Sequence, residues 1–405
     1  MRVPLASSGL RSEDIEAAIA VLQSGNLTMG KKVIEFEKLM ANYLGVDHFV
    51  MMNSGSSANL AIFEAMMRPS KSEPLLRRGD GVLVPAIAWP TTIWPVVQLG
   101  LVPIFVDVDR ESLSLDLIQA AVAIRNTKCP VRAIFPIHPL GRALDSSALL
   151  NFASENQLTY ISDACESLGS FESGRHAGSS GLAGSFSFYF SHHITTMEGG
   201  GVATNSLEFA DDLRSIRSHG WSRDRSDVTE WTNEVSGTDA KFLFVTTGYN
   251  VRPMEIQAAI GINQIRDINS FVERRRKIAE SVIEAVNGTS LTVVGVNSKA
   301  LTYESSANSW MLIPIRVIGE NAKQRKKKIL EALENRGIET RPVLTGNFLS
   351  QPAMNRIDGN HAPASDFPVA TEITETCFLV GAHHDLSNEQ IVHLCESLQS
   401  VENYI

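Results

Sequence analysis

The strongest constraint on the fold is an alternation of short apolar runs and helical segments between residues 82 and 163. The runs lack the strict apolar–polar alternation of a strand with one solvent-exposed face. We therefore expect strands that are buried on both faces. Strands of this kind, separated by helices, build a mostly parallel sheet with helices on both sides, an α/β fold. The expected strands are 82–86, 102–109, 131–137 and 158–163, and the expected helices are 91–100, 115–124 and 147–157.

The pattern changes after Gly261. A long amphipathic segment predicts a helix that leads out of the main sheet. After it the sequence predicts strand 309–318, helix 322–337, strand 338–343 and helix 387–400. We therefore predict two domains. Residues 1–261 form a large domain that begins with a helical segment, and residues 262–405 form a bridging helix and a smaller α+β domain.

Charge and cysteine usage exclude several classes of protein. The formal net charge of −9 argues against non-specific binding to nucleic acids. The first residues lack the basic-then-apolar build of a secretory signal. The four cysteines form no C-x-x-C or C-x-C pair, which argues against a metal site and a disulfide framework and favours a cytoplasmic protein. They are Cys129, Cys165, Cys377 and Cys395.

One uncharged stretch, from Gly81 to Val106, is long enough to cross a bilayer. Four prolines interrupt it, and prolines are disfavoured inside helices. They are Pro85, Pro90, Pro95 and Pro103. We predict a buried strand, helix and strand here, and no membrane insertion.

Two features after the expected strands fit a flat, phosphorylated ligand. Ser56 and Ser57 follow an apolar run and precede an apolar helix, so their N–H and hydroxyl groups could bind a phosphate. Serine caps at an ordinary strand-to-helix turn explain the same pattern. Trp89 follows the next strand and could stack on a flat ring, although a lone tryptophan also suits a core.

Two further features carry chemical groups. Asp163 ends an apolar strand, where a carboxylate could pair with a pyridinium nitrogen; a helix cap is the alternative. The stretch GSFSFYFSHHITTMEGGG places Ser187 five residues before His192. An imidazole at that point can take up or release a proton near neutral pH.

In this order the features resemble the fold-type I pyridoxal-phosphate enzymes, whose fold is that of aspartate aminotransferase. More narrowly, the chain resembles the DegT/DnrJ/EryC1/StrS family of sugar aminotransferases. The matching segments are LTMGKKVIEFE (27–37), SDACESLG (162–169), SHHITTMEGGG (191–201), GYNVRPMEIQAAIG (248–261) and ETRPV (339–343). The resemblance implies the cofactor pyridoxal phosphate, held by Ser56, Ser57, Trp89, Asp163 and Ser187.

His192 departs from this family, which has a lysine at that position. The lysine forms the internal Schiff base, and an imidazole cannot, because it has no primary amine. Histidine here is similar to the pyridoxamine-phosphate-dependent 3-dehydratases of deoxysugar biosynthesis. A second branch of such dehydratases binds an iron–sulfur cluster through a C-x-C pair, which this chain lacks, so we expect no cluster.

The resemblance implies a reaction and a set of partners. We expect removal of the C3 hydroxyl of a nucleotide-linked 4-keto-6-deoxyhexose, GDP-4-keto-6-deoxy-D-mannose, with L-glutamate as the amino donor that regenerates pyridoxamine phosphate. His192 is the expected base. We also expect a homodimer that shares its active sites, because Asn250 matches an asparagine that reaches the phosphate from the neighbouring subunit.

Five other positions are carried over from the resemblance. Glu166 lies where the family has a glutamine or glutamate near the cofactor. The expected contacts to the substrate or to glutamate are His219, Arg223, Glu339 and Arg341, since arginine recognises carboxylates and diphosphates with two parallel hydrogen bonds. A surface or structural ion pair is the alternative for each.

Two other functions stay open from the sequence. The chain could be an aminotransferase that uses a different lysine, although no lysine lies between Gly184 and Gly201. It could also be a non-catalytic homologue that still binds the cofactor. The retained acid and the glycine-rich segment after His192 favour an active enzyme.

Overall fold

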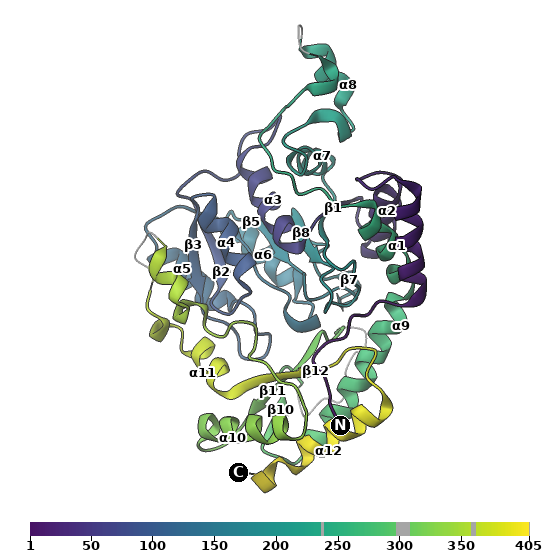
Figure 1. The fold of residues 1–405 in the computed structure, drawn as a ribbon. Helices are drawn as coiled ribbons and strands as arrows, with labels where there is room; N and C mark the ends of the chain where they lie inside the picture. The colour runs from purple at the N-terminus through teal and green to yellow at the C-terminus, as the bar shows by residue number, and fades with distance from the viewer. Residues whose placement is uncertain (236–238, 297–307, 358–361, 405) are drawn as a thin grey trace.

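The computed structural model describes residues 1–235, 239–296, 308–357 and 362–404, and its centre is a seven-stranded sheet (Figure 1). The strand order is β1–β9–β8–β5–β4–β2–β3. β9 runs antiparallel to both of its neighbours, and the other pairs are parallel. The strands are β1 (His48–Met52), β2 (Gly81–Pro85), β3 (Val102–Val106), β4 (Val131–Ile134), β5 (Thr159–Asp163), β8 (Ala183–Ser187) and β9 (Gly200–Thr204).

Alternate residues of β2 pack into different cores, so both faces of the sheet are covered. Val82 and Val84 contact the core shared with α3 (Gly55–Met67) and α4 (Pro90–Gln98). Leu83 contacts the core shared with α5 (Leu117–Asn126) and α6 (Ser146–Glu155). Each of these three side chains is fully buried, and each contributes about 1.5–3 kcal/mol to folding. The predicted α/β class with a mostly parallel sheet is confirmed.

The uncharged stretch from Gly81 to Val106 forms β2, α4 and β3, as the prolines indicate. Pro90 lies in the first turn of α4, where its missing N–H costs no hydrogen bond. Among the described residues, no helix is both long and apolar enough to span a membrane.

Helix α9 (Glu255–Val286) joins the main sheet to a second core (Figure 1). Its first half packs against α2 (Lys31–Leu44), through Ala258, Ile262 and Ile265. Its second half, with Ile278 and Val282, belongs to a separate core around a small sheet. α1 (Ser12–Ser24) also lies against α9.

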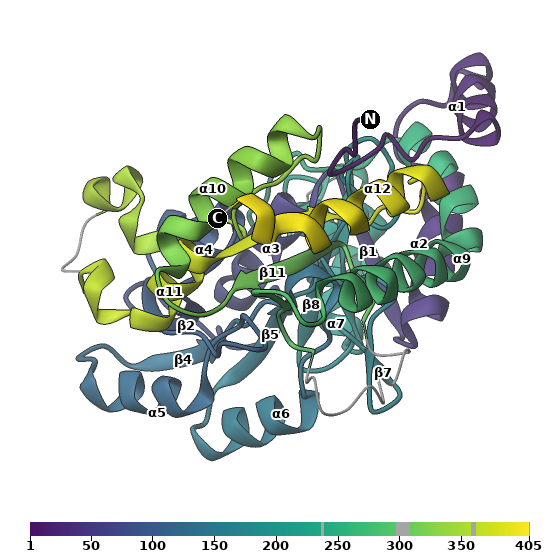
Figure 2. The same ribbon diagram turned by 90° about the horizontal axis from the view of Figure 1, so that it is seen from below.

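The small sheet is antiparallel and has the order β10 (Leu291–Val293), β11 (Leu312–Val317), β12 (Cys377–Gly381). In Figure 2 the helices α10 (Ala322–Asn335) and α12 (Asn388–Gln399) lie over it. Val3 is buried in the same core, so the N-terminal residues pack with this unit. The predicted border at 261/262 falls inside α9, and the division into two domains stays a prediction.

The strand predicted at 338–343 is wrong. This segment makes only isolated bridges, from Ile338 to Val3 and from Arg341 to Leu379. A ladder cannot continue past Arg341 because Pro342 has no N–H to donate. β12, which the sequence pattern did not predict, is the strand that pairs with β11. α11 (Pro368–Thr376) precedes β12 directly.

Candidate active site

A cavity of about 370 Å³ lies at the carboxyl ends of the main strands. Asp163 ends β5 and Ser187 ends β8, while Trp89 follows β2. Parallel strands place these ends at one edge of the sheet, where ligands bind in open α/β folds. The cavity is lined by Ser54, Gly55, Ser56, Trp89, Thr91, Thr92, Ile137, His138, Asp163, Cys165, Glu166, Ser187, Tyr189, Ser191, His192, Glu198, Met311, Arg341 and Leu344.

The N-terminus of α3 forms one side of the cavity. Ser54 is the N-cap, and its hydroxyl accepts a hydrogen bond from Ser57 N at 3.0 Å. Ser56 lines the cavity, whereas Ser57 belongs to the cap and does not line it. Free N–H groups and the helix dipole make this end of α3 suited to a phosphate.

Glycines allow the close approach of three segments beside this helix end. A Cβ on Gly55 would lie 2.6 Å from Ser187 Cβ and 2.9 Å from Cys165 Sγ. A Cβ on Gly200 would collide with the backbone of Ser54 and Gly55. The glycine run after the histidines therefore lets β9 lie directly behind the start of α3.

Asp163 is held by donors from two helices and from its own loop. Oδ2 accepts hydrogen bonds from Asn59 Nδ2 at 2.8 Å and from Thr92 Oγ1 at 2.9 Å. Oδ1 accepts one from Cys165 N at 3.1 Å. These bonds fix the carboxylate at the wall of the cavity, where it can bind a protonated ring nitrogen.

Trp89 and Arg341 lie at the open side of the cavity. Trp89 is the N-cap of α4 and is 50 % exposed, so its ring is available to a ligand. The Arg341 guanidinium lies 5.9 Å from the centre of that ring, within cation–π range. The Trp89 ring and the Arg341 guanidinium are therefore neighbours at this side of the cavity.

His192 faces the cavity from the loop after β8. Its Nδ1 lies 3.2 Å from the Ser187 carbonyl oxygen. A carbonyl only accepts, so Nδ1 carries the proton and Nε2 of the neutral ring is free to accept one. Burial lowers the pKa of His192 to about 4; the Ser187 carbonyl and Asp163 oppose this effect, and Arg275 and Arg341 add to it. The imidazole is therefore neutral at pH 7.

Glu166 is the second titratable group at the wall. Its Oε2 accepts a hydrogen bond from Leu140 N at 3.0 Å. Burial raises the pKa of Glu166 to about 7, although the Leu140 N–H and Arg341 favour its charged form. This carboxyl group is therefore partly protonated at neutral pH.

The predicted site residues fall into two groups. Seven of the twelve line the cavity: Ser56, Trp89, Asp163, Glu166, Ser187, His192 and Arg341. Three others, Asn250, His219 and Arg223, lie outside it and are exposed, and the bridge between Ser218 and Asn250 places His219 beside Asn250. Arg223 stacks on Trp221, with its guanidinium 4.2 Å from the ring centre.

Glu339 and Ser57 are the remaining two. Glu339 accepts hydrogen bonds from Arg2 Nε at 2.8 Å and from Leu5 N at 3.0 Å. It therefore ties the N-terminal segment to the small unit and does not line the cavity.

Sequence reasoning missed several residues of the wall. Asn59 and Thr92 orient Asp163, and His138 and Ser191 line the cavity. Ser191 could have been predicted as a cavity residue, because it directly precedes His192. Asn59 and Thr92 lie close in sequence to Ser56 and Trp89, but no local pattern indicated that their side chains contact Asp163.

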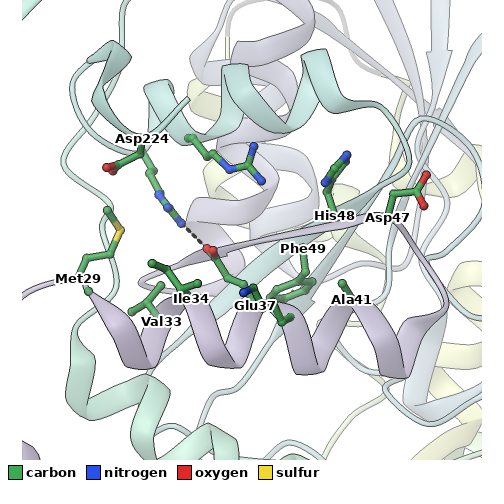
Figure 3. Close-up of a pocket in the computed structure, with 13 residues that line it drawn as sticks. Met29, Val33, Ile34, Glu37, Ala41, Asp47, His48, Phe49 and Asp224 are labelled. Atoms are coloured by element: carbon green, nitrogen blue, oxygen red, sulfur yellow. Dashed lines mark hydrogen bonds and ion pairs between the residues drawn. The ribbon is translucent and has the colours of Figure 1, made fainter. Parts of the chain in front are cut away.

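A larger hollow of about 510 Å³ lies between α2 and α7 (Leu207–Ile216) (Figure 3). Glu37 crosses it to pair with Arg217 at 2.6 Å, the contact drawn as a dashed line. None of the predicted site residues lines this hollow. The smaller cavity, which gathers seven of the predicted residues, is therefore the better candidate for chemistry.

The smaller cavity fits a flat, phosphorylated pyridine ring. The start of α3 suits the phosphate, the Asp163 carboxylate suits the ring nitrogen, and Trp89 suits the ring face. His192 lies at the wall where a ring substituent could meet it. Within the part of the chain that the structure describes, no lysine lines the cavity.

Comparison with known proteins gives one consistent family. Residues 9–399 match the DegT/DnrJ/EryC1/StrS aminotransferase family. A GDP-4-keto-6-deoxy-D-mannose 3-dehydratase from Yersinia pseudotuberculosis is 35 % identical over 404 residues, which cover 98 % of both chains.

Two solved structures add detail. A GDP-4-keto-6-deoxymannose-3-dehydratase with a trapped PLP-glutamate geminal diamine has a TM-score of 0.84 and 31 % identity, covering 98 % of this chain and 100 % of that one. A double variant of such an enzyme has a lysine in place of a histidine and an asparagine in place of the serine directly before it. Its TM-score is 0.86 at 31 % identity, covering 97 % of this chain and 100 % of that one.

Proposed function

This chain belongs to the DegT/DnrJ/EryC1/StrS aminotransferase family, and we propose that it is a pyridoxamine-phosphate-dependent 3-dehydratase. The substrate is a nucleotide-linked 4-keto-6-deoxyhexose, and the product is the 4-keto-3,6-dideoxy sugar. One observation carries the proposal: the cavity wall has an imidazole, His192, at the position of the family's lysine, and no lysine of the described residues lines the cavity.

A solved relative supports the assignment of His192. That enzyme has been studied with its histidine and the preceding serine replaced. This chain contains two Ser–His sequences, 191–192 and 218–219. Only the first lines the cavity, since His219 is exposed elsewhere.

Three groups of the chain would hold the cofactor. The N–H groups at the start of α3 and the Ser56 hydroxyl bind the phosphate, Asp163 keeps the ring nitrogen protonated, and Trp89 covers one face of the ring. When bound, pyridoxamine phosphate supplies an amine for the sugar's C4 carbonyl and a ring that accepts electrons. The three donors on Asp163 hold its carboxylate in place for this task.

His192 acts as the general base of the dehydration. Its Nδ1–H is fixed by the Ser187 carbonyl, which leaves Nε2 to accept a proton from the bound reactants. The lowered pKa keeps the ring neutral at pH 7. A lysine here would capture the cofactor covalently and favour amine transfer. With histidine, the cofactor stays free in its amine form.

L-Glutamate regenerates the amine form and leaves as 2-oxoglutarate. A relative solved with a PLP-glutamate adduct supports this donor. Arg341 is the candidate for a glutamate carboxylate, because its guanidinium lies at the cavity wall. The net reaction converts the keto-sugar and glutamate into the dideoxy sugar, 2-oxoglutarate and ammonia. The sugar loses one oxygen atom.

GDP-4-keto-6-deoxy-D-mannose is the proposed substrate. The support is the similarity to GDP-linked 3-dehydratases over nearly the whole chain. The sugar diphosphate would enter at the open side of the cavity, near Arg341.

We also propose a homodimer in which each subunit completes the other's site. Four large apolar side chains, two of which line the cavity and two of which lie in the segment that follows β8, are 39–50 % exposed, and a second chain would cover them. They are Trp89, Tyr189, Phe190 and Met197. Asn250, His219 and Arg223 are exposed and lie outside the cavity of their own chain, so they are available to a partner. A mixture of inactive His192→Asn and inactive Asn250→Ala chains should regain activity if sites are shared.

The reaction is tested with purified protein, pyridoxal phosphate, L-glutamate and GDP-4-keto-6-deoxymannose. We expect 2-oxoglutarate and a sugar lighter by one oxygen atom, both seen by mass spectrometry. A sugar that carries an amine at C4 would make the chain an aminotransferase. Neither product, with the cofactor still bound, would indicate a non-catalytic homologue. His192→Asn is the matched control and should lose the dideoxy product.

A further inference from the structure

Arg275 on α9 has the largest fully buried side chain among the described residues, with 1 % of its surface exposed. It neighbours Arg274 and Arg276, which are both half-buried, so only one of three consecutive arginines is fully buried. Burying a cation costs several kcal/mol unless other groups compensate for lost water.

Among the residues that the structure describes, this cation is hydrogen-bonded by backbone carbonyls and by no carboxylate. Nη1 donates to the carbonyl oxygens of Trp310 at 3.3 Å and Met311 at 3.1 Å. Nη2 donates to the His192 carbonyl oxygen, also at 3.3 Å. Asp385 acts on it only through space. One guanidinium thus links α9, the segment before β11 and the loop that carries His192.

Arg275 also lines a small chamber behind the active-site wall. The chamber has a volume of about 10 Å³, close to the space that one water molecule needs. Four histidines line it with Arg275: His192, His193, His383 and His384. Ser191 and His192 line both this chamber and the active-site cavity, so they form the wall between the two.

The chamber holds buried nitrogen atoms without a hydrogen bond among the described residues: Arg275 Nε, His384 Nδ1, and both ring nitrogens of His193 and His383. The backbone of Ser309 approaches His193, and that of Pro4 approaches His383, without reaching hydrogen-bond geometry. Burial, with Arg275 as the next cause, lowers the pKa of His383 and His384 to about 4. The histidines are therefore neutral at pH 7, and Arg275 carries the charge of the chamber.

The charged groups that face His192 act in opposite directions. Asp163 on β5 and the Ser187 carbonyl favour the imidazolium form. Arg275 on α9 and Arg341 disfavour it. Arg341 lies at the open side and would be engaged by an anionic ligand, whereas Arg275 is walled off from the cavity. Arg275 therefore acts on His192 whether or not substrate is bound.

We propose that Arg275 is a positioning residue for His192: from behind the cavity wall, its guanidinium fixes the loop that carries the imidazole through a hydrogen bond to the His192 carbonyl. This inference rests on the proposed role of His192 as the base. It gives a reason to keep a buried cation where an apolar side chain would pack as well or better.

The test compares Arg275→Met, which removes the charge, with Arg275→Lys, which keeps it. Arg276→Met is the matched control, because it removes a neighbouring cation on the same helix whose Nε bonds the Asn308 carbonyl. The full-length proteins are labelled with ¹³C-histidine and titrated by NMR from about pH 4 to about pH 7, a range that contains both expected pKa values. The His192 signal is assigned by its loss in His192→Asn.

At pH 5 we expect about a tenth of His192 to be protonated in the wild type and about half in Arg275→Met, a tenfold change in proton affinity. Arg275→Lys and Arg276→Met should titrate like the wild type. Hydrogen exchange of the peptide 188–197 should also be faster in Arg275→Met. An unchanged titration and unchanged exchange in a folded Arg275→Met protein would overturn the proposal.

Two safeguards keep the result clear. If Arg275→Met does not fold, Arg275→Gln takes its place, because it removes the charge and keeps a hydrogen-bond donor. The same titration of His192 then tests the proposal. Neither readout needs turnover, so a protein that makes no dideoxy sugar can still show the effect of Arg275 on His192. The two proposals can therefore fail separately.

Discussion

The Asn59 side-chain amide donates a hydrogen bond to Asp163 Oδ2 at 2.8 Å, and both side chains are buried. The same amide also donates to the Thr91 carbonyl at 3.0 Å. Asn59 thus joins the first turns of α3 and α4 to the end of β5. The hydrogen bonds of Asn59 therefore connect the proposed phosphate site at the start of α3 with the carboxylate proposed to bind the ring nitrogen.

Replacing Asn59 with leucine should weaken pyridoxal phosphate binding by about 10–100-fold. The change removes one donor to a charged acceptor, worth about 1.5–3 kcal/mol. Asp163 would keep Thr92 and the Cys165 N–H but lose part of its orientation. The affinity is measured by absorbance titration of the purified protein. Asn263→Leu, whose amide bonds the Glu13 carbonyl far from the cavity, is the control and should bind normally.

Much of the site could be predicted because it follows strands. Asp163, Ser187 and Trp89 each come directly after or at the end of an apolar run, and a parallel sheet brings such ends together. The sequence pattern also identified the glycines after His192, although it could not show that Gly200 lies against the backbone of Gly55. That contact joins residues 145 positions apart.

The sequence pattern could not predict which helical side chains contact the site. Asn59 and Thr92 lie on α3 and α4, where polar residues usually face water or cap a turn. Their contact with Asp163 depends on how the helices pack, which no local signal encodes. The same holds for Arg275. Which arginine of the run ERRRK is buried depends on how α9 is rotated against the two cores, and the run itself does not show this.

His192→Lys should abolish dehydration and bind the cofactor covalently. A lysine amine at the cavity wall can attack the cofactor aldehyde, which an imidazole cannot do. Borohydride reduction followed by peptide mass spectrometry should find the cofactor on residue 192. Wild-type protein treated in the same way should carry no label there. Normal dehydration by this variant would show that His192 is not the base.

His193→Asn should cost stability and not activity. His193 is 1 % exposed and lines the rear chamber, not the active-site cavity. Loss of ring volume should lower the free energy of unfolding by about 1–3 kcal/mol, measured by urea denaturation. Turnover per folded molecule should stay within about threefold of wild type. His192→Asn should give the opposite result, with a loss of about 100-fold or more in turnover and little change in stability.

Glu166 should lower the free energy of unfolding as the pH rises from about 4.5 to about 7. Burial raises its pKa to about 7 in the folded protein, whereas an exposed glutamate ionises near 4.5. Below pH 4.5 both states hold the proton. Between pH 4.5 and 7 the unfolded chain loses it while the folded chain keeps it, so folding is progressively disfavoured. At about 1.4 kcal/mol for each pKa unit, the shift corresponds to at most about 3.5 kcal/mol. Because the side chain is only half-buried at the cavity wall, solvent screens it and we expect about 2 kcal/mol.

Glu166→Gln removes this dependence. Urea denaturation at pH 5 and pH 7.5 should show that the wild type loses more stability over this interval than the variant does. Glu331→Gln on the exposed side of α10 is the matched control and should follow the wild type. A Glu166→Gln protein with the same loss between the two pH values would mean that Glu166 is already ionised at pH 5. The carboxyl group could then not hold a proton at neutral pH, and it could serve the site only as an anion.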